Sequence, residues 1–225
     1  MFTASRWLAG LAVLVCFAGS VRAGDESEIK QTAKSFAQAM SKGDADGARK
    51  YMVRTDDTDA MIDALTPVVA GRLKLDKALT SKFGEEGIKG VSGGIGMNQA
   101  MTQYADHVDD ADVKIDGNRA TVSRKPDADN KPAAAAAARD NALHMKKVDG
   151  DWKVDMTSLQ NLQKLKQQIP MMQAMGKVMT DLADEVDGGK YKTVAEVNVA
   201  MKQKMLATFQ GMARQGGRPG AAPAK

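Results

Sequence analysis

The sequence predicts an α+β protein, with N-terminal helices packed on a small antiparallel sheet of two hairpins and a long C-terminal helical extension. Over most of residues 26–108, apolar residues recur every three or four positions, as in amphipathic helices. Apolar and polar residues then alternate around two turn sequences, Gly117-Asn118 and Asp149-Gly150, as in β-hairpins. Helical spacing returns after the second hairpin and continues almost to the end of the chain.

Residues 1–23 have the pattern of a secretory signal peptide, with Arg6, an apolar run over Trp7–Ala18 and small residues before Ala23. The run is about a dozen residues, whereas roughly 20 are needed to span a bilayer. We therefore expect export to the periplasm or the medium of a bacterium, with cleavage after Ala23 and no stable membrane insertion afterwards. An uncleaved anchor is the alternative. Cleavage would remove the only cysteine, Cys16, and with it any disulfide, thiol nucleophile or cysteine metal site.

The expected mature chain has 30 basic and 28 acidic residues, once Arg6 and Arg22 are removed, and a net charge of +2. The two signs alternate, which is typical of solvated helix faces. No basic patch is interleaved with aromatic residues, so nucleic acid is not an expected partner. The organisation that we expect is a signal peptide, an α+β domain, a helical extension and a tail that is disordered by composition, over residues 1–23, 24–156, 157–213 and 214–225.

The first two helices have clear boundaries in the sequence. One helix places five apolar residues on one face and stops at Gly43, and these residues are Ile29, Ala33, Phe36, Ala37 and Met40. Asp44 then caps a short second helix. An EF-hand calcium loop starting at Asp44 would need a glycine at Arg49 and a glutamate at Thr55, so a cap is the better interpretation.

A third helix is expected over residues 58–83, ending at Gly84. Proline costs about 3 kcal/mol inside a helix, so Pro67 is expected to break or kink it, with Thr66 as a candidate cap for its second half. A fourth helix is expected over residues 97–108, with Met101, Tyr104 and Val108 at helical spacing.

Six glycines between Gly84 and Gly96 predict a mobile loop or lid. A phosphate-binding loop would need a lysine and a Ser or Thr directly after its last glycine, where Met97-Asn98 stand instead. A phosphate site is therefore not expected there.

The first hairpin has a self-consistent register. With Gly117-Asn118 as a two-residue loop, Ile115 pairs with Ala120 and Val113 with Val122, so all four side chains share one face. A long, alanine-rich connection over residues 126–141 separates it from the second hairpin.

In the second hairpin, a two-residue turn at Asp149-Gly150 pairs Lys147 with Trp152 and directs that tryptophan to the apolar face. Val148 then falls on the opposite face. A three-residue loop with a bulge, which would set Val148 opposite Trp152, is the alternative. In both versions Asp149 and Asp151 lie at a solvated turn and do not form a metal site.

The C-terminal extension predicts two helices. The first covers residues 159–186, with Pro170 expected to kink or split it, and Gly188-Gly189 ends it. Thr193 and Glu196 form a capping box for the second. Its apolar set is Val194, Val197, Met201, Met205, Phe209 and Met212.

Two short motifs carry a resemblance to a known superfamily, namely Gly43-Asp44 between the first two helices and the closing hairpin Asp149-Gly150-Asp151-Trp152-Lys153-Val154. With this element order, residues 25–156 resemble nuclear-transport-factor-two-like proteins, the cone-shaped α+β fold of ketosteroid isomerases, SnoaL-like cyclases and many exported domains. The resemblance implies a curved sheet packed against helices around a pocket. In enzymatic members, that pocket holds an acid/base carboxylate or histidine. No catalytic motif matches residue by residue, so the resemblance implies a shape and not an activity.

The pocket candidates are Tyr104, His107, His144 and Trp152. Histidine titrates near neutral pH, but the aspartates around His107 favour a helix end followed by a polar loop. His144 stands between Leu143 and Met145 and lies outside the core if those two residues face it. A register shift of one residue would reverse this.

Methionines at Met172, Met175 and Met179 have helical spacing. Thioethers favour Cu(I), but methionine stripes more often form cores or adaptable contact surfaces. We therefore expect no cofactor.

The function that we expect is an exported, non-catalytic binding or interaction module of the cell envelope with a small apolar pocket. Its partner would be a protein or a small apolar ligand, and a homodimer through the sheet or the C-terminal helices is a further option. One alternative is a small-pocket enzyme, similar to an isomerase, cyclase or hydrolase, that uses a group near Tyr104, His107 and Trp152. A second is a methionine-rich carrier of soft metal ions.

Overall fold

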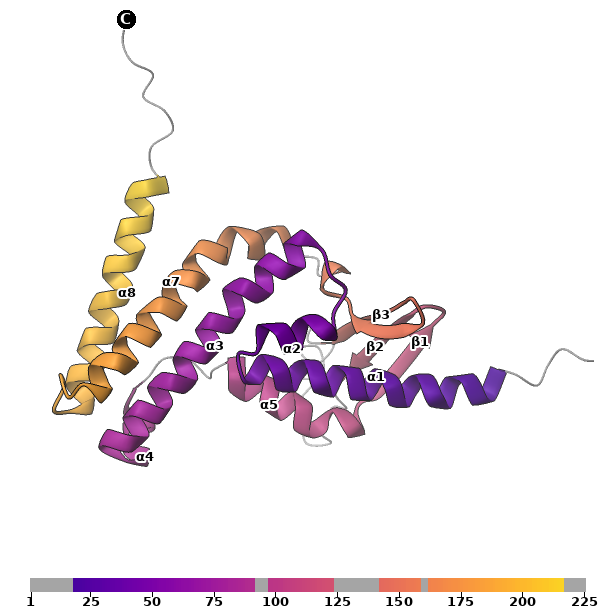
Figure 1. The fold of residues 1–225 in the computed structure, drawn as a ribbon, viewed down its shortest axis with the longest axis horizontal. Helices are drawn as coiled ribbons and strands as arrows, with labels where there is room; N and C mark the ends of the chain where they lie inside the picture. Colours follow the sequence, from indigo (N-terminus) through magenta and orange to yellow (C-terminus); the bar gives the residue numbers. More distant parts are fainter. Residues whose placement is uncertain (1–17, 92–96, 124–141, 159–161, 217–225) are drawn as a thin grey trace, which may run out of the picture.

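The described residues form an α+β fold, in which a four-stranded antiparallel sheet follows the N-terminal helices along the chain and precedes the C-terminal helices (Figure 1). A computed structural model describes residues 18–91, 97–123, 142–158 and 162–216. The helices before the sheet are α1 (Ala18–Ser41), α2 (Ala45–Lys50), α3 (Asp56–Phe83), α4 (Glu85–Gly90) and α5 (Met97–His107), followed by the 3-10 turn η1 (Val108–Asp110). The strands are β1 (Asp112–Asp116), β2 (Arg119–Ser123), β3 (Leu143–Val148) and β4 (Asp151–Val154). After them come the 3-10 turn η2 (Met156–Ser158), α7 (Leu162–Asp187) and α8 (Val194–Gly216).

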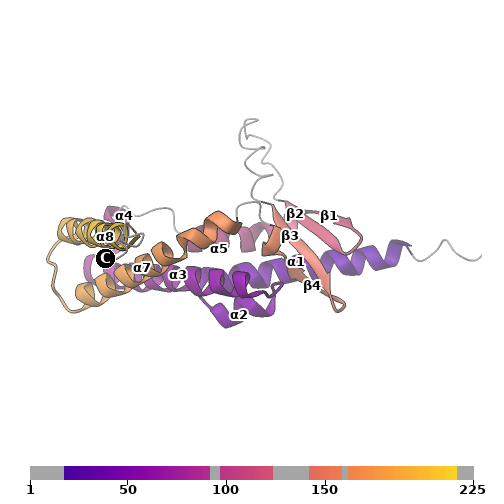
Figure 2. The ribbon, with the colours of Figure 1, turned by 90° about the horizontal axis from the view of Figure 1, so that it is seen from above.

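The described residues form an elongated molecule with the sheet towards one end and a helical group at the other (Figure 2). Helices α1, α2 and α5 lie with the sheet, and α4 and α8 belong to the helical group (Figure 1). Helix α3 runs between the two ends, and α7 packs along it. None of the described helices combines the length and apolarity needed to cross a membrane.

The strands follow one another in the order β1-β2-β3-β4. Both predicted hairpin registers are confirmed, with Ile115 opposite Ala120 and Lys147 opposite Trp152. Asp149 and Gly150 have φ values of 54° and 96°, the left-handed conformation that a tight two-residue turn requires. Val148 pairs with Asp151, so the alternative three-residue loop is not formed. Trp152 therefore points to the inner face of the sheet, where it is 1% exposed.

The inner face of the sheet packs against α1, and this layer is the first of two hydrophobic cores (Figure 2). The core includes the predicted apolar face of α1 together with side chains from all four strands, among them Ile29, Phe36, Met40, Ile62, Val122, Met145, Trp152 and Val154. The free side of β4 is partly covered, because Val53 N donates to Val154 O (2.8 Å) and Val154 N donates to Tyr51 O (2.8 Å). Asp44 caps α2 as predicted, accepting a hydrogen bond from Gly47 N.

The second core joins the end of α3 to α4, α7 and α8, with Leu75, Leu79, Leu182, Val186, Val197 and Met201 buried in it. The predicted capping box of the last helix is confirmed, because Glu196 N donates to Thr193 Oγ1 and Lys192 N donates to Glu196 Oε2. Phe209, which was expected on the apolar face, is 39% exposed, because the residues of α8 that pack in this core end at Met205.

Glu185 fastens α8 to the end of α7. Its carboxylate accepts hydrogen bonds from Lys190 Nζ (2.8 Å), from the Tyr191 hydroxyl (2.5 Å) and from Lys204 Nζ of α8 (3.1 Å). The hydrogen bonds from Lys190 and Tyr191, with a further contribution from Lys204, lower the pKa of Glu185 to about 2. Burial and the neighbouring carboxylate raise the pKa of Tyr191 to about 12.

Helices α3 and α7 approach so closely at one point that only glycine fits. A Cβ atom on Gly71 would lie 2.7 Å from Gly176 O, and one on Gly176 would lie 2.9 Å from the carbonyl carbon of Pro67. The predicted break at Pro67 is wrong, because α3 continues through it. The free energy gained by burying one face of α3 on both sides of Pro67 exceeds the free-energy cost of one proline inside a helix.

Other boundary predictions were also wrong. Thr66 caps no helix, and its hydroxyl instead donates to Ile62 O (2.8 Å), while Thr55 provides the cap of α3. Part of the glycine-rich segment forms α4, because Gly87 packs tightly on the end of α3. Helix α7 is not split at Pro170, although its ribbon bends near its start (Figure 1). Residues 92–96 and the connection over 126–141 lie outside the described residues.

Replacing Gly176 by alanine should destabilise the protein by about 1–3 kcal/mol, because the new methyl group meets backbone atoms of α3 that cannot move independently. Urea unfolding followed by circular dichroism measures this. Gly211→Ala is the matched control, since nothing lies within 4 Å of a Cβ there and alanine in a helix gains about 0.5–1 kcal/mol. Equal stability of the Gly176→Ala variant and the parent would contradict the close contact.

Glu185 should make stability depend on pH in the acid range. Its folded pKa of about 2 lies below the ordinary value of 4.5, so its contribution is complete above pH 4.5 and is lost as the pH falls towards 2. We expect the free energy of unfolding to fall less steeply over this range in Glu185→Gln than in the parent. Tyr191→Phe, which removes one donor, should be intermediate. Parallel pH profiles for the parent and Glu185→Gln would refute this account.

Candidate functional site

The outer face of the sheet carries the side chains that alternate with the core residues. The strand register lines them up in two rows across the sheet. One row is Lys114, Thr121 and His144, and it is extended by Asp155, whose N–H donates to His144 O (2.7 Å). The other row is Asp116, Arg119, Lys146 and Lys153.

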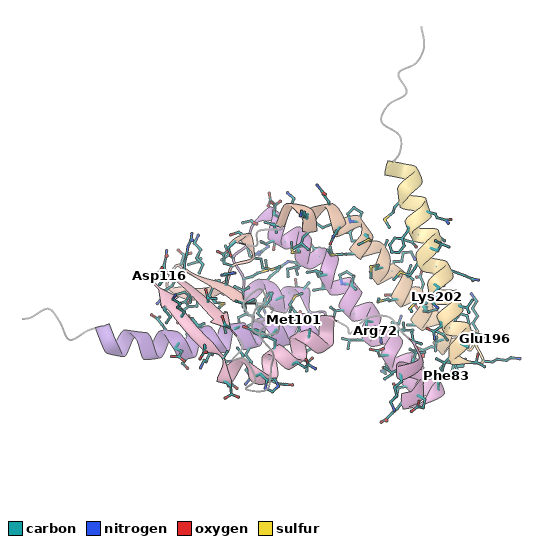
Figure 3. All side chains as sticks on the ribbon, turned by 180° about the vertical axis from the view of Figure 1, so that it is seen from behind. Arg72, Phe83, Met101, Asp116, Glu196 and Lys202 are labelled. Atoms are coloured by element: carbon teal, nitrogen blue, oxygen red, sulfur yellow. The ribbon has the colours of Figure 1, made fainter. Side chains whose placement is uncertain are left out.

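A cleft of about 280 Å³ opens on this face. Seven of its nine lining residues have charged or polar side chains, and the lining residues are Lys114, Asp116, Arg119, Ala120, Thr121, His144, Met145, Asp155 and Ser158. Asp116, at the turn end of β1, lies at the sheet end of the molecule, far from Glu196 and Lys202 on α8 (Figure 3). The cleft is therefore separate from the helical end.

The basic residues of the cleft are available for a ligand. Among the described residues, the side chains of Lys114, Arg119 and His144 have no hydrogen bond or ion pair. Lys114 and Arg119 come from the first hairpin, at one side of the cleft, and His144 stands between them and Asp155 in the sheet. Unpaired cations on a polar surface can bind a carboxylate or phosphate group.

Asp155 is the rigid anion of the cleft. It is only 7% exposed, and its Oδ1 accepts hydrogen bonds from Thr157 N (3.0 Å) and Thr157 Oγ1 (2.5 Å). Ser158 Oγ donates to the backbone carbonyl of Asp155 (2.9 Å). The 3-10 turn η2 thus fixes one carboxylate oxygen, while Oδ2 has no hydrogen bond within the described part of the chain.

The four predicted pocket residues do not come together. His144 lines the cleft on the outer face, whereas Trp152 is buried on the inner face. Tyr104, on α5, packs against the same core as Trp152, and its buried hydroxyl has no partner among the described residues. That burial raises the pKa of Tyr104 above its ordinary value. His107 is exposed where α5 ends, as the sequence predicted.

Trp152 has a structural role. Its indole Nε1 donates to Asp25 Oδ1 (3.0 Å), and its backbone N donates to Glu28 Oε1 (2.9 Å), so it ties β4 to the start of α1. Lys147 completes the contact, because its Nζ lies 2.6 Å from Asp25 Oδ1 and 5.5 Å from the centre of the indole ring. The hydrogen bonds from Lys147 and Trp152 lower the pKa of Asp25, and the bond to Asp25 raises the pKa of Lys147.

The methionines of α7 also belong to the packing. Met179 is 6% exposed and lies beside Gly71 in the contact with α3, while Met172 and Met175 are half-buried. In the described ranges, no group of three or more His, Cys, Asp or Glu side chains could hold a metal ion.

Sequence reasoning missed most of the cleft. Lys114, Arg119, Thr121 and Asp155 were not among the predicted site residues, although the first hairpin's register already places Lys114 and Thr121 opposite each other. The missing information was the pairing of β2 with β3, which joins Thr121 to His144 across a long connection. Extending the alternation of β4 by one residue would have placed Asp155 on the same face as His144.

No protein-family model matches the chain, and neither a curated protein nor a solved structure matches it significantly. The resemblance to nuclear-transport-factor-two-like proteins therefore stays a prediction. The chain is therefore described by its α+β fold and by the cleft on its sheet.

Replacing Asp25 by alanine should loosen the start of α1, because Lys147 and the Trp152 indole both lose their acceptor. In a full chain carrying Trp7→Phe, Trp152 is the only tryptophan and reports directly on this contact. We expect a red-shifted Trp152 emission and a lower urea midpoint. Glu26→Ala is the control, since Glu26 forms only an exposed ion pair with Lys30. Unchanged emission in Asp25→Ala would contradict the anchoring role.

Proposed function

We propose that this chain is an exported, non-catalytic binding module that holds a small polar ligand in the cleft on the outer face of its sheet. The observation that carries the proposal is the convergence of Lys114, Arg119 and His144, unpaired among the described residues, in a cleft of about 280 Å³. Clefts with a few convergent polar groups are the usual place for small-molecule binding.

The proposed ligand is small and polar, whereas the sequence led us to expect a protein partner or a small apolar ligand. The inner face of the sheet, which would have to line an apolar pocket, packs against α1 with Met145, Trp152 and Val154 each only 1% exposed. The cleft lies on the other face, where alternation places charged and hydroxyl side chains.

Binding is favoured over catalysis by the surroundings of the titratable groups. A general base is normally held by a hydrogen bond to an orienting group, and His144 has none among the described residues. Strongly shifted pKa values often mark catalytic sites. Three groups have strongly shifted pKa values, and all three lie outside the cleft. They are the carboxyl group of Glu185 and the phenol groups of Tyr191 and Tyr104. Export is supported by the signal-peptide pattern of residues 1–23.

The two histidines of the chain offer a direct test, because His144 lines the cleft and His107 is exposed elsewhere. The protein is expressed from the full chain and purified from the exported fraction, where its intact mass should correspond to residues 24–225. Its imidazole NMR signals, assigned with His144→Gln, are then followed during titration with glutarate, 1,5-diaminopentane and 5-aminopentanoate. We expect at least one probe to shift His144 and leave His107 in place.

Two results would count against the proposal. If none of the three probes moves the His144 signals, the cleft is not a small-molecule site. If the purified protein retains residues 1–23 or stays in the cytoplasm, the exported part of the proposal fails.

A further inference from the structure

We infer that the ligand of the cleft is zwitterionic, with a carboxylate bound by Lys114 and Arg119 and an ammonium group bound by Asp155, as in an amino acid or a short peptide. This inference rests on the proposed function, since it names the chemical class of ligand for the same cleft.

The charges of the lining favour a ligand with no net charge. Lys114 and Arg119 supply two positive charges, and Asp116 and Asp155 supply two negative ones. The lining residues of the first hairpin, Lys114, Asp116 and Arg119, together carry one net positive charge, which lies across the sheet from the negative charge of Asp155. A dianion would place one anionic end towards Asp155, and a dication would place one cationic end towards Lys114. Each would bring like charges together at one end of the cleft, which is unfavourable.

The width of the sheet sets the separation of the ligand's two charges. Lys114, Thr121, His144 and Asp155 follow one another across the row, so the first and last are three strand steps apart, roughly 14 Å between Cα atoms. The lysine side chain reaches into this gap, and each charged hydrogen bond occupies about 2.8 Å. The Asp155 side chain also takes part of the gap, so the space that remains suits a short ligand such as an amino acid or a dipeptide.

The two ends of the cleft differ in rigidity in a way that suits this ligand. The Asp155 carboxylate is already oriented by Thr157, so binding an ammonium group at its second oxygen costs little further ordering. The flexible Lys114 side chain can adapt to ligands of different length. Thr121 and His144, between the ends, offer hydrogen-bonding groups for an amide or a polar linker.

The test compares three probes with five-carbon chains that differ only in their charged ends. These are 5-aminopentanoate (one end of each sign), glutarate (two carboxylates) and 1,5-diaminopentane (two ammonium groups). Dissociation constants are measured from the His144 NMR signals, with His107 as internal control. We expect 5-aminopentanoate to bind at least tenfold more tightly than either of the others.

Variants then show which residue of the cleft binds each charged end of the ligand. Asp155→Asn keeps the acceptor for Thr157 but removes the charge, and should weaken 5-aminopentanoate while improving glutarate. Lys114→Glu should reverse the preference towards 1,5-diaminopentane. Lys202→Gln is the control, because Lys202 lies on α8 at the far end of the molecule (Figure 3) and should leave all three dissociation constants unchanged.

The experiment separates failure of the zwitterion inference from failure of the proposed binding function. If glutarate or 1,5-diaminopentane moves the His144 signals and binds as tightly as 5-aminopentanoate, the zwitterion inference is overturned and the proposed binding function stands. The same holds if Lys114→Glu and Asp155→Asn leave the order of the probes unchanged. If no probe moves His144, both proposals fail.

Discussion

The arrangement of this protein depends on the line of contact between α3 and α7. Helix α3 contributes Ile62 to the core under the sheet and Leu75 to the core at the helical end, so one continuous helix serves both. Gly71 and Gly176 let α7 lie directly on the α3 backbone. A side chain at either glycine would force the helices apart and disturb two cores at once, because interiors are packed too densely to absorb the displacement locally.

The two faces of the sheet differ in their surroundings, because one is buried and the other carries the cleft. Its inner face is closed by α1, with Trp152 fixed by Asp25 and Glu28 at the start of that helix. Since side chains alternate along a strand, each residue committed to the core places its neighbour on the outer face. Met145 is buried and His144 therefore lines the cleft. The geometry of the cleft is in this sense a consequence of the packing beneath it.

Local signals predicted the local elements well. Both hairpins follow from turn residues flanked by alternation, and the Asp44 cap follows from its side-chain chemistry. Of the two outcomes expected at Pro67 and Pro170, a kink or an interruption, the interruption does not occur, because burial along α3 and α7 outweighs proline's local preference, which sequence alone does not reveal. The cleft was missed for a related reason. It needs the pairing of β2 with β3, two strands separated by a long connection, and Asp155, which lies one residue beyond β4.

The position of Asp25 links the accuracy of processing to the quality of the folded protein. In the exported form that we propose, the chain would begin one residue before this carboxylate. A cut only two residues further along would discard the acceptor that holds Lys147 and the Trp152 indole. The shortened product would keep every residue of the cleft but would hold the hairpin that carries His144 and leads into Asp155 only through Glu28. A ragged N-terminus would thus yield a mixed population in which chains identical in their cleft residues differ in how firmly those residues are held.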